Sequence, residues 1–365
     1  MNNFLERVKP MNIYIFMFLL VILLTPILKG TLKYNKTYIV LMSMILFGVC
    51  AFRGVRVGAD LGRYETHFRI CLNLDFQSIF TVYGWDCIGF YELIKLFQIF
   101  FGDNFHGFLF TLATIEGLIF GYIIYKHSVN PYMSVMLYMA LGYYAFIYSG
   151  LKQALATAVV MLAFDFLIRR KYIFFLIITC IAGLIHTPAI LFMGAIIIAH
   201  KKINWKTVIV YFIVTGIMFV FSRKVAVFLV SAYDSIVDLE GIGGVGGKLI
   251  MMSLFIIAGY VLRIPNDENK TYLCLFNFMI VASILQILAV YGNVFERLAD
   301  YYFIFSVLYL PLVFEKIERR RGSIKGIVLY DEKIYILSNI VLIIFSLIYF
   351  YVTINNTYGL LPYYI

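Results

Sequence analysis

Long apolar runs alternate with short polar connections along almost the whole chain. Each run has 15–28 residues, which is close to the roughly 20 that a helix needs to cross a bilayer core. The pattern predicts an all-α integral membrane protein, a polytopic helical bundle of about 11–13 membrane segments. The runs cover residues 12–28, 37–52, 105–125, 131–148, 151–168, 172–199, 207–222, 248–262, 271–291, 300–314 and 334–352.

One run, 172–199, is too long for a single straight span. It is interrupted in the middle by His186-Thr187-Pro188. Proline removes a backbone donor and restricts the residue before it. We therefore expect two short helices that meet at His186 and form a hairpin, which enters the membrane and returns.

The composition agrees with a membrane protein. Hydrophobic residues make up 63% of the chain and aromatic residues 18%, and the mean hydropathy is +0.91. These values leave no room for a soluble domain of ordinary size. We interpret residues 1–365 as a single polytopic membrane domain, with an outer-face loop and interfacial-helix region at 53–104 and an outer loop at 223–247.

The net charge of +10 would suggest nucleic acid as a partner for a soluble protein. Here most of the 30 basic residues lie in alternate connections between apolar runs, where they set the topology. We therefore expect no nucleic-acid partner and assign the basic connections to the cytoplasm. The stretch 86–101 is apolar on one side and is typical of an amphipathic helix that lies along the membrane interface.

A cluster of charged residues follows the apolar run 37–52, at the predicted outer membrane edge. Arg53 and Arg56 are three residues apart, and their planar guanidinium groups could bind neighbouring phosphate oxygens. The alternative is that these arginines bind lipid headgroups or only end the helix. Asp60 and Tyr64 add acceptor and donor groups that an anchor would not need, and they favour a binding site.

Two further basic residues lie at the outer ends of predicted helices. Lys152 begins the run 151–168, where its side chain could contact a ligand or extend to the headgroups. Arg297 lies near Glu296 and Asp300, which could satisfy it as a local ion pair. Three ionisable groups within five residues at a membrane boundary favour a site over that alternative.

His186 is the candidate for proton transfer. A histidine on an apolar surface is commonly a satisfied core residue, but its usual pKa of about 6.5 suits acid–base chemistry near neutral pH. No spacing resembles a metal site and no P-loop is present, so we expect neither a metal nor a cofactor. The G-x-G-x-x-G string at 241–246 follows no strand, and we interpret it as part of an outer loop.

Four segments, in this order, resemble the EpsG/Wzy group of bacterial polysaccharide polymerases. The resemblance spans most of the chain, and the order of the segments is more specific than any one of them. In the second segment the family often has an arginine before the glutamine, and Lys152 occupies that place here. The segments are Arg-Gly-Val-Arg-Val-Gly-Ala-Asp-x-x-x-Tyr (53–64), Leu-Lys-Gln-Ala-Leu-Ala (151–156), Gly-Leu-Ile-His-Thr-Pro-Ala (183–189) and Glu-Arg-Leu-Ala-Asp-Tyr-Tyr (296–302).

The resemblance implies a glycosyltransferase of the Wzy polymerase type, similar in build to the integral-membrane GT-C enzymes. Such a protein would lie in the bacterial cytoplasmic (inner) membrane and join oligosaccharide repeat units carried on undecaprenyl diphosphate at its outer face. The product would be O-antigen lipopolysaccharide, capsule or exopolysaccharide. The expected partners are the lipid-linked oligosaccharide, membrane lipids, a chain-length regulator and the flippase of the same pathway.

This reaction must neutralise a diphosphate leaving group and remove a proton from an acceptor hydroxyl. His186 or Asp60 could accept the proton, and we prefer His186 because the nearby arginines stabilise the ionised carboxylate of Asp60 and weaken it as a base. The expected diphosphate ligands, which would have to converge in one outer cavity, are Arg53, Arg56, Lys152 and Arg297. The weaker candidates for contacts with the glycan are Tyr64, Asp300 and Tyr301.

Two other functions are compatible with the sequence. A flippase or transporter of the same lipid-linked oligosaccharide would suit the broken helix and the buried polar residues Glu116, Asn277 and Gln286. Against it, the chain has no internal repeat and its charges gather on one side. An O-antigen ligase-type glycosyltransferase would use the same diphosphate-binding groups with a different acceptor.

Overall fold

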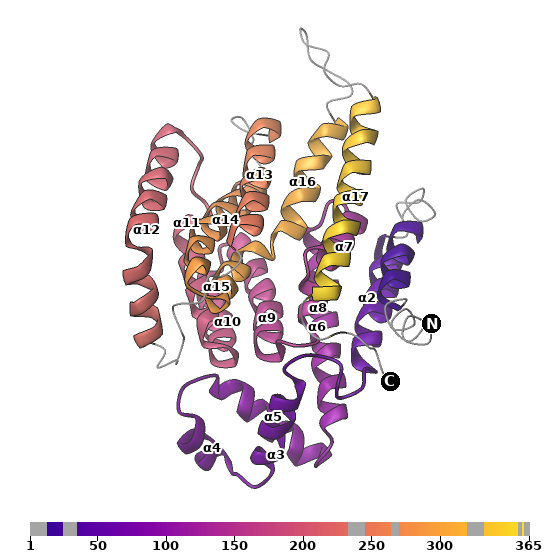
Figure 1. Cartoon of the computed structure of the whole chain (residues 1–365), viewed down its shortest axis with the longest axis vertical. Coiled ribbons are helices and arrows are strands. Elements are labelled where there is room, and N and C mark those ends of the chain that lie inside the picture. The colour runs from indigo at the N-terminus through magenta and orange to yellow at the C-terminus, as the bar shows by residue number, and fades with distance from the viewer. Residues whose placement is uncertain are drawn as a thin grey trace.

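The computed structural model describes residues 13–24, 35–232, 245–263, 270–319, 332–356 and 360. Within these residues the chain forms helices and turns and no strand (Figure 1), so the all-α prediction is confirmed. A short helix, Ile13–Leu24, comes first. The others are α2 (Asn35–Ala51), α3 (Leu61–Leu72), α4 (Phe76–Tyr83), α5 (Ile88–Phe101), α6 (Phe105–His127), α7 (Pro131–Ala140), α8 (Tyr143–Phe146), α9 (Leu151–Ile168), α10 (Tyr172–Ile185), η2 (Thr187–Gly194), α11 (Ala195–Ile198), α12 (Trp205–Ala232), α13 (Val245–Arg263), α14 (Lys270–Gln286), η3 (Ile287–Tyr291), α15 (Asn293–Phe303), α16 (Ser306–Arg319) and α17 (Glu332–Asn356).

Four of the described helices are long and apolar enough to cross a membrane: α6, α9, α12 and α14 with its continuation η3. A fifth span results if α15 and α16, which are bent by 42° at a short break, count as one. The protein is therefore a multi-pass membrane protein. The expected 11–13 segments exceed this number, because six other apolar helices in the described parts of the chain are only 10–17 residues long.

Two of the apolar runs are divided by local backbone geometry. Gly142 has a φ of 86° and separates α7 from α8, a conformation that a glycine adopts without strain. His186 is extended, with φ −147° and ψ 106°, and Pro188 follows at the start of η2. The prediction of two short helices that meet at His186 is confirmed.

The segment predicted as an outer loop at 223–247 is in part helical. Within 223–247, α12 continues to Ala232 and α13 begins at Val245, while residues 233–244, including most of the G-x-G-x-x-G string, lie outside the described residues. The helix continues past its polar residues because Ala226 and Leu229 pack in an apolar cluster with Leu288.

The predicted outer region folds as three helices, α3, α4 and α5, that lie across one end of the bundle (Figure 1). Phe68 of α3 packs against Phe97 of α5 and Phe108 of α6. The amide of Gln98 also donates a hydrogen bond of 2.7 Å to the Phe68 carbonyl. One face of α5 is buried, while Phe100 on another is 73% exposed. An exposed apolar side chain suits the membrane interface, and the position of α5 along that interface stays a prediction.

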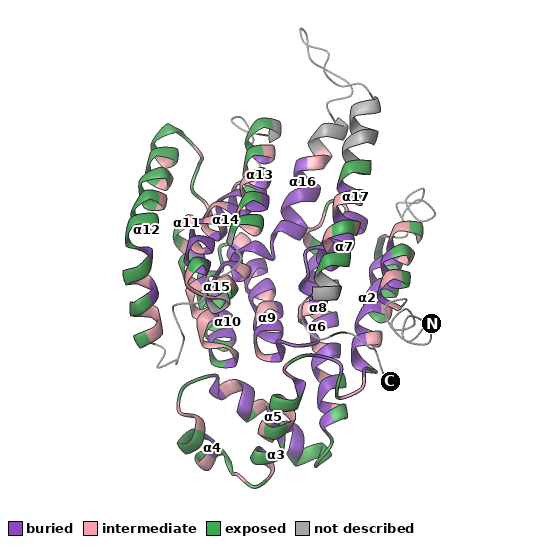
Figure 2. Ribbon diagram, viewed as in Figure 1, coloured by how far each residue is buried: buried purple, intermediate pink, exposed green. Residues whose placement is uncertain are grey.

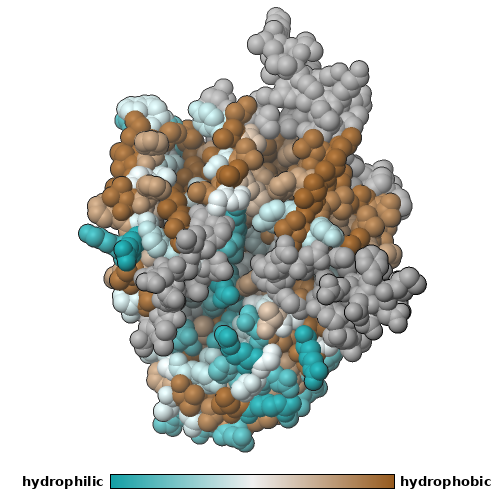
Figure 3. All heavy atoms as spheres, viewed as in Figure 1, coloured by the Kyte–Doolittle hydropathy of each residue, from teal (hydrophilic) through white to brown (hydrophobic). Residues whose placement is uncertain are grey.

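The opposite end of the bundle carries the connections between α6 and α7, α9 and α10, and α11 and α12. The last turn of α6 contains Lys126 and the connection after α9 contains Arg169, Arg170 and Lys171. Hydrophilic residues at the other end gather over the α3–α5 layer (Figure 3). The positive-inside rule therefore predicts that the α3–α5 layer faces the outer side.

The main hydrophobic core lies between the helices of the bundle and continues into the α3–α5 layer through residues such as Phe68 and Phe90. Residues of α7, α9 and α16 are mostly buried, while α12 is exposed along most of its length (Figure 2). Its apolar exposed face suits contact with lipid. The buried Asn277 of α14 donates hydrogen bonds to the carbonyls of Ile198 and Lys201 and accepts one from Tyr211, so its polar side chain holds neighbouring helices together.

Candidate active site

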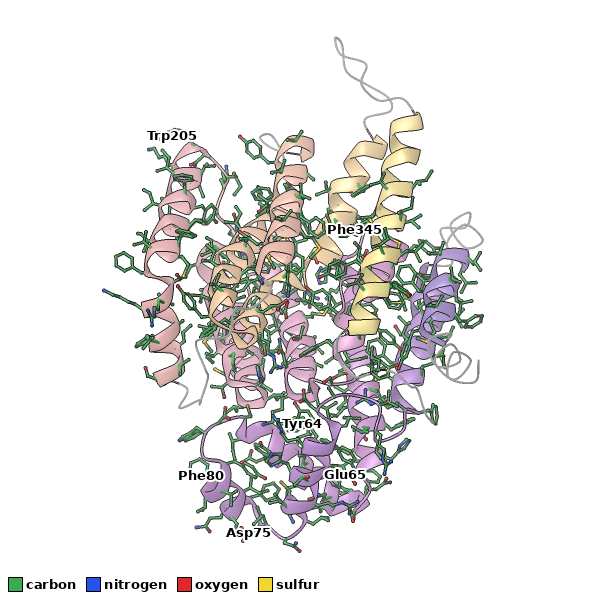
Figure 4. The ribbon with its side chains drawn as sticks, viewed as in Figure 1. Tyr64, Glu65, Asp75, Phe80, Trp205 and Phe345 are labelled. Atoms are coloured by element: carbon green, nitrogen blue, oxygen red, sulfur yellow. The ribbon has the colours of Figure 1, made fainter. Side chains whose placement is uncertain are left out.

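A cavity of about 300 Å³ lies where the α3–α5 layer meets the bundle. In Figure 4, Tyr64 lies on the bundle side of this layer, whereas Asp75 and Phe80 lie farther from the bundle. The walls come from α3, the turn before α5, the start of α9, the break before η2, the end of α12, and α15. The charged and polar side chains of the lining are Asp60, Arg63, Tyr64, His67, Asp86, Lys152, Gln153, His186 and Arg297.

One face of α3 forms the floor of the cavity. Asp60, Arg63, Tyr64 and His67 are three or four residues apart, so the helix brings them to one side. Asp60 accepts a hydrogen bond of 3.1 Å from the Ser149 hydroxyl. The spacing along α3 thus brings a carboxylate, a guanidinium, a phenol and an imidazole to the same cavity.

Gly58 fixes the position of this face relative to the bundle. Its φ is 138°, and a Cβ atom there would overlap the carbonyl oxygen of Tyr148. Only glycine allows the turn before α3 to approach the bundle so closely. The turn thereby brings Asp60 within reach of Ser149, the residue after Tyr148.

Lys152 lies in the first turn of α9, beside the cavity. Its ammonium donates a hydrogen bond of 2.7 Å to the Tyr91 hydroxyl and lies 4.3 Å from the centre of that ring. Its backbone N–H is 3.5 Å from the Tyr64 hydroxyl, and Gly150 also lines the cavity. The partial positive charge of a helix N-terminus adds to the charge of the lysine, and both favour an anion.

His186 is held by a buried tyrosine. It lies between α10 and η2, outside the helices that are long enough to cross a membrane, and its Nδ1 is 2.6 Å from the Tyr301 hydroxyl. If Nδ1–H donates to Tyr301, then Nε2 carries the lone pair that a base needs. Burial, together with positive Arg297 and Lys152, lowers the pKa of His186 to about 3. The imidazole is therefore neutral at pH 7.

Arg297 reaches the cavity from α15 and is exposed. The amide of Gln153 donates a hydrogen bond of 3.4 Å to the Arg297 carbonyl and joins α9 to α15. Among the described residues, the guanidinium has no carboxylate within ion-pair distance. Glu296 and Asp300 instead bind Lys248 of α13, at 2.7 and 2.6 Å.

The model of the EpsG family matches residues 36–365, which is nearly the whole chain. The chain belongs to the EpsG family. Because this is a family of Wzy-like polysaccharide polymerases, membership supports a polymerase-like role in general. No curated protein and no solved structure matches the chain, so the expected similarity to GT-C enzymes stays a prediction.

Of the expected diphosphate ligands in this EpsG protein, Lys152 and Arg297 line the cavity and two do not. Arg53 is 1% exposed, donates hydrogen bonds to the Ile147 carbonyl and the Cys50 sulfur, and lies over the Tyr148 ring. It fixes the end of α2 against the bundle. The exposed Arg56 is absent from the cavity lining. All four cations therefore do not converge in this cavity, because Arg53 is used in packing and Arg56 lies outside the lining.

The other predicted site residues also divide into those that line the cavity and those that do not. Asp60, Tyr64 and His186 line the cavity. Tyr301 is fully buried and contacts His186 rather than the cavity. Asp300 is bound to Lys248, so the geometry does not support direct glycan contacts for either of these two.

The cavity also contains residues that the sequence analysis did not select. Arg63 and His67 share the α3 face with Asp60, and their spacing in the sequence carried this signal. Burial, together with the positive charges of Lys152 and Arg63, lowers the pKa of His67. Asp86 accepts a hydrogen bond of 2.9 Å from the Thr187 hydroxyl. This contact joins segments far apart in the chain, so no local sequence pattern predicts it. Among the described residues, no group of three His, Cys, Asp or Glu side chains could hold a metal ion.

Proposed function

We propose that this EpsG protein is a polysaccharide polymerase that joins oligosaccharide repeat units carried on undecaprenyl diphosphate, at the outer face of the bacterial cytoplasmic membrane. The observation that carries the proposal is the gathering of Arg63, Lys152 and Arg297 in one cavity with His186 and Asp60. Cations for a leaving group and candidate bases for an acceptor thus lie together. Family membership supports the same reaction class.

In the proposed reaction, an acceptor hydroxyl of one lipid-linked unit attacks the anomeric carbon of the growing glycan. A new C–O bond forms, and the bond from that carbon to the diphosphate breaks. The leaving diphosphate gains negative charge, which the guanidinium groups of Arg63 and Arg297 and the ammonium of Lys152 stabilise. The start of α9 contributes further positive potential, and the proposal therefore requires no metal ion.

The proton of the acceptor hydroxyl passes to His186 in this proposal. A pKa of about 3 makes His186 a weak base, but the charges of Arg297 and Lys152 are, after burial, among its causes. A bound diphosphate would neutralise both charges and raise the pKa of the imidazole. The substrate would thus strengthen the base that acts on it. Asp60, held by Ser149, is the second candidate for the base.

The glycan would lie along the wall formed by α3 and the turn before α5. Tyr64 presents its hydroxyl at the cavity, and its ring packs edge-to-face on Phe90 at 5.7 Å. A ring held in this way can contact a sugar without losing further conformational freedom. A flippase that delivers the lipid-linked unit and a separate chain-length regulator would be partners in the same membrane.

Deletion of the gene, followed by analysis of the surface glycan, tests the proposal against its two alternatives. Loss of a polymerase should leave a single repeat unit on the surface lipid. Loss of a flippase should leave none, and loss of a ligase should leave long chains on undecaprenyl diphosphate. Either of the last two results would overturn the proposal.

A further inference from the structure

Of the cavity cations, Arg297 has the acidic residues nearest to it in the sequence, and these could neutralise its charge. Two acidic residues, Glu296 and Asp300, lie one residue before it and three residues after it. Residues three apart on a helix are neighbours, so Asp300 in particular is close enough in sequence to pair with Arg297. Such a pair would neutralise the guanidinium that the cavity presents to an anion.

Lys248 prevents this pairing in the structure. Glu296 and Asp300 are four residues apart on α15 and face α13, where the Lys248 ammonium lies between their carboxylates at 2.7 and 2.6 Å. The lysine side chain is only 14% exposed. Its position over the Phe303 ring, 5.9 Å from the ring centre, restricts it further. Both carboxylates are thus directed toward α13, whereas Arg297 lines the cavity.

The charge balance of the cavity depends on this arrangement. Three positive side chains, Arg63, Lys152 and Arg297, and two negative ones, Asp60 and Asp86, line it, which leaves one net positive charge. Without Lys248, two carboxylates next to this lining would lack their cation and would make the region negative. An anionic ligand would then be repelled.

We infer that Lys248 is a positioning residue for the anion site: it binds Glu296 and Asp300 and keeps Arg297 available for the diphosphate. The inference rests on the proposed function for the identity of the anion. The contacts on which it depends involve no ligand, and its electrostatic part is testable without substrate.

The first experiment measures the potential at position 297 directly. In a Cys87→Ser/Cys180→Ser background, because Cys87 also lines the cavity, Arg297→Cys is labelled with a negatively charged and with a positively charged methanethiosulfonate, in the presence of Lys248 or with Lys248→Met. We expect the ratio of anionic to cationic labelling rates to fall by about tenfold when the lysine is removed. An unchanged ratio would overturn the inference, whatever the activity of the protein.

The second experiment tests whether the lysine acts through the two carboxylates. Lys248→Met should lower chain growth about as strongly as Arg297→Ala, while the triple variant Lys248→Met/Glu296→Gln/Asp300→Asn should recover most of the activity. Lys206→Met, a change at an exposed lysine of α12 near the opposite end of the bundle, is the matched control. If the triple variant reaches the membrane in normal amounts and stays as inactive as the single variant, the lysine has another role.

The two experiments separate this inference from the proposed function. A changed labelling ratio with unchanged chain growth would show that Lys248 sets the potential but that the cavity is not the site of polymerisation. A loss of chain growth with an unchanged ratio would leave the polymerase proposal standing and reject the role of Lys248.

Discussion

Basic side chains gather at both ends of the bundle, but the two ends use them differently. At the end opposite the α3–α5 layer, the side chain of Asp165 of α9 is 2% exposed and contacts three basic side chains. Lys126 and Arg169 bind it at 2.8 and 2.6 Å, and the Nε2 atom of His127 lies at 2.8 Å. This cluster joins α6 to α9 and leaves little charge for a ligand.

At the cavity end, the same residue types line the cavity without an ion pair to a carboxylate. Within the described residues, Arg63, Lys152 and Arg297 make no ion pair, although Asp60 and Asp86 line the same cavity. Cations paired with a buried carboxylate serve the fold, whereas cations that make no such pair retain the charge to bind an anion. The contrast supports the proposal that the cavity is the functional end.

The largest effect on this contrast should come from His186→Gln. The variant keeps a polar side chain beside Tyr301 but removes the basic nitrogen, so chain growth should fall by about 10²–10⁴-fold. The rate of repeat-unit joining by purified protein in lipid nanodiscs measures this. A variant with the wild-type rate would assign the base to another group, with Asp60→Asn as the next test.

Arg297→Ala should be the next most damaging change. Loss of one charged donor to the leaving group should lower the rate by about 10²–10³-fold. Arg69→Ala is the matched control, because Arg69 pairs with Glu65 and Asp103 on the exposed side of the layer. Arg56→Ala should likewise leave chain length unchanged, since Arg56 does not line the cavity. If Arg56→Ala shortens chains as much as Arg297→Ala, the assignment of the cavity is wrong.

A smaller effect is expected for the pH dependence of Lys152→Met. The positive charge of Lys152 helps to lower the pKa of His186 to about 3, so removing it should raise that pKa. The loss of kcat/KM on acidification should therefore begin at a higher pH in the variant than in the wild type. Measurements between pH 4 and 8 test the sign, and a shift to lower pH would contradict the electrostatic account.

Asp165→Asn should have the smallest effect on catalysis and a clear effect on stability. Three basic groups would lose their shared carboxylate, which we expect to cost about 2 kcal/mol, because Lys126 and Arg169 are partly exposed. Thermal unfolding in detergent measures this change. The joining rate per folded molecule should stay close to that of the wild type. A selective loss of activity with normal stability would remove the distinction between the two ends.

The sequence predicted the helical course well because apolar runs and their interruptions are local signals. The break at His186 followed from the Pro188 that comes two residues later. The predicted loop at 223–247 failed in part because the end of α12 is stabilised by packing against Leu288, which lies far away in the chain. The expected diphosphate contact of Arg53 does not fit its burial, since no sequence pattern distinguishes a guanidinium buried against Ile147 from one that faces a ligand.

By itself, the sequence determined that this is a multi-pass helical membrane protein of the EpsG family and where its ionisable residues lie along the chain. The tertiary structure decided which of those residues share a cavity. Arg63, Lys152 and Arg297 come from three helices far apart in sequence, and Lys248 comes from a fourth helix to occupy the neighbouring carboxylates. Hydropathy and helix breaks depend on neighbours in the chain, but pairing of charges depends on distances in space, which only the packing of helices sets.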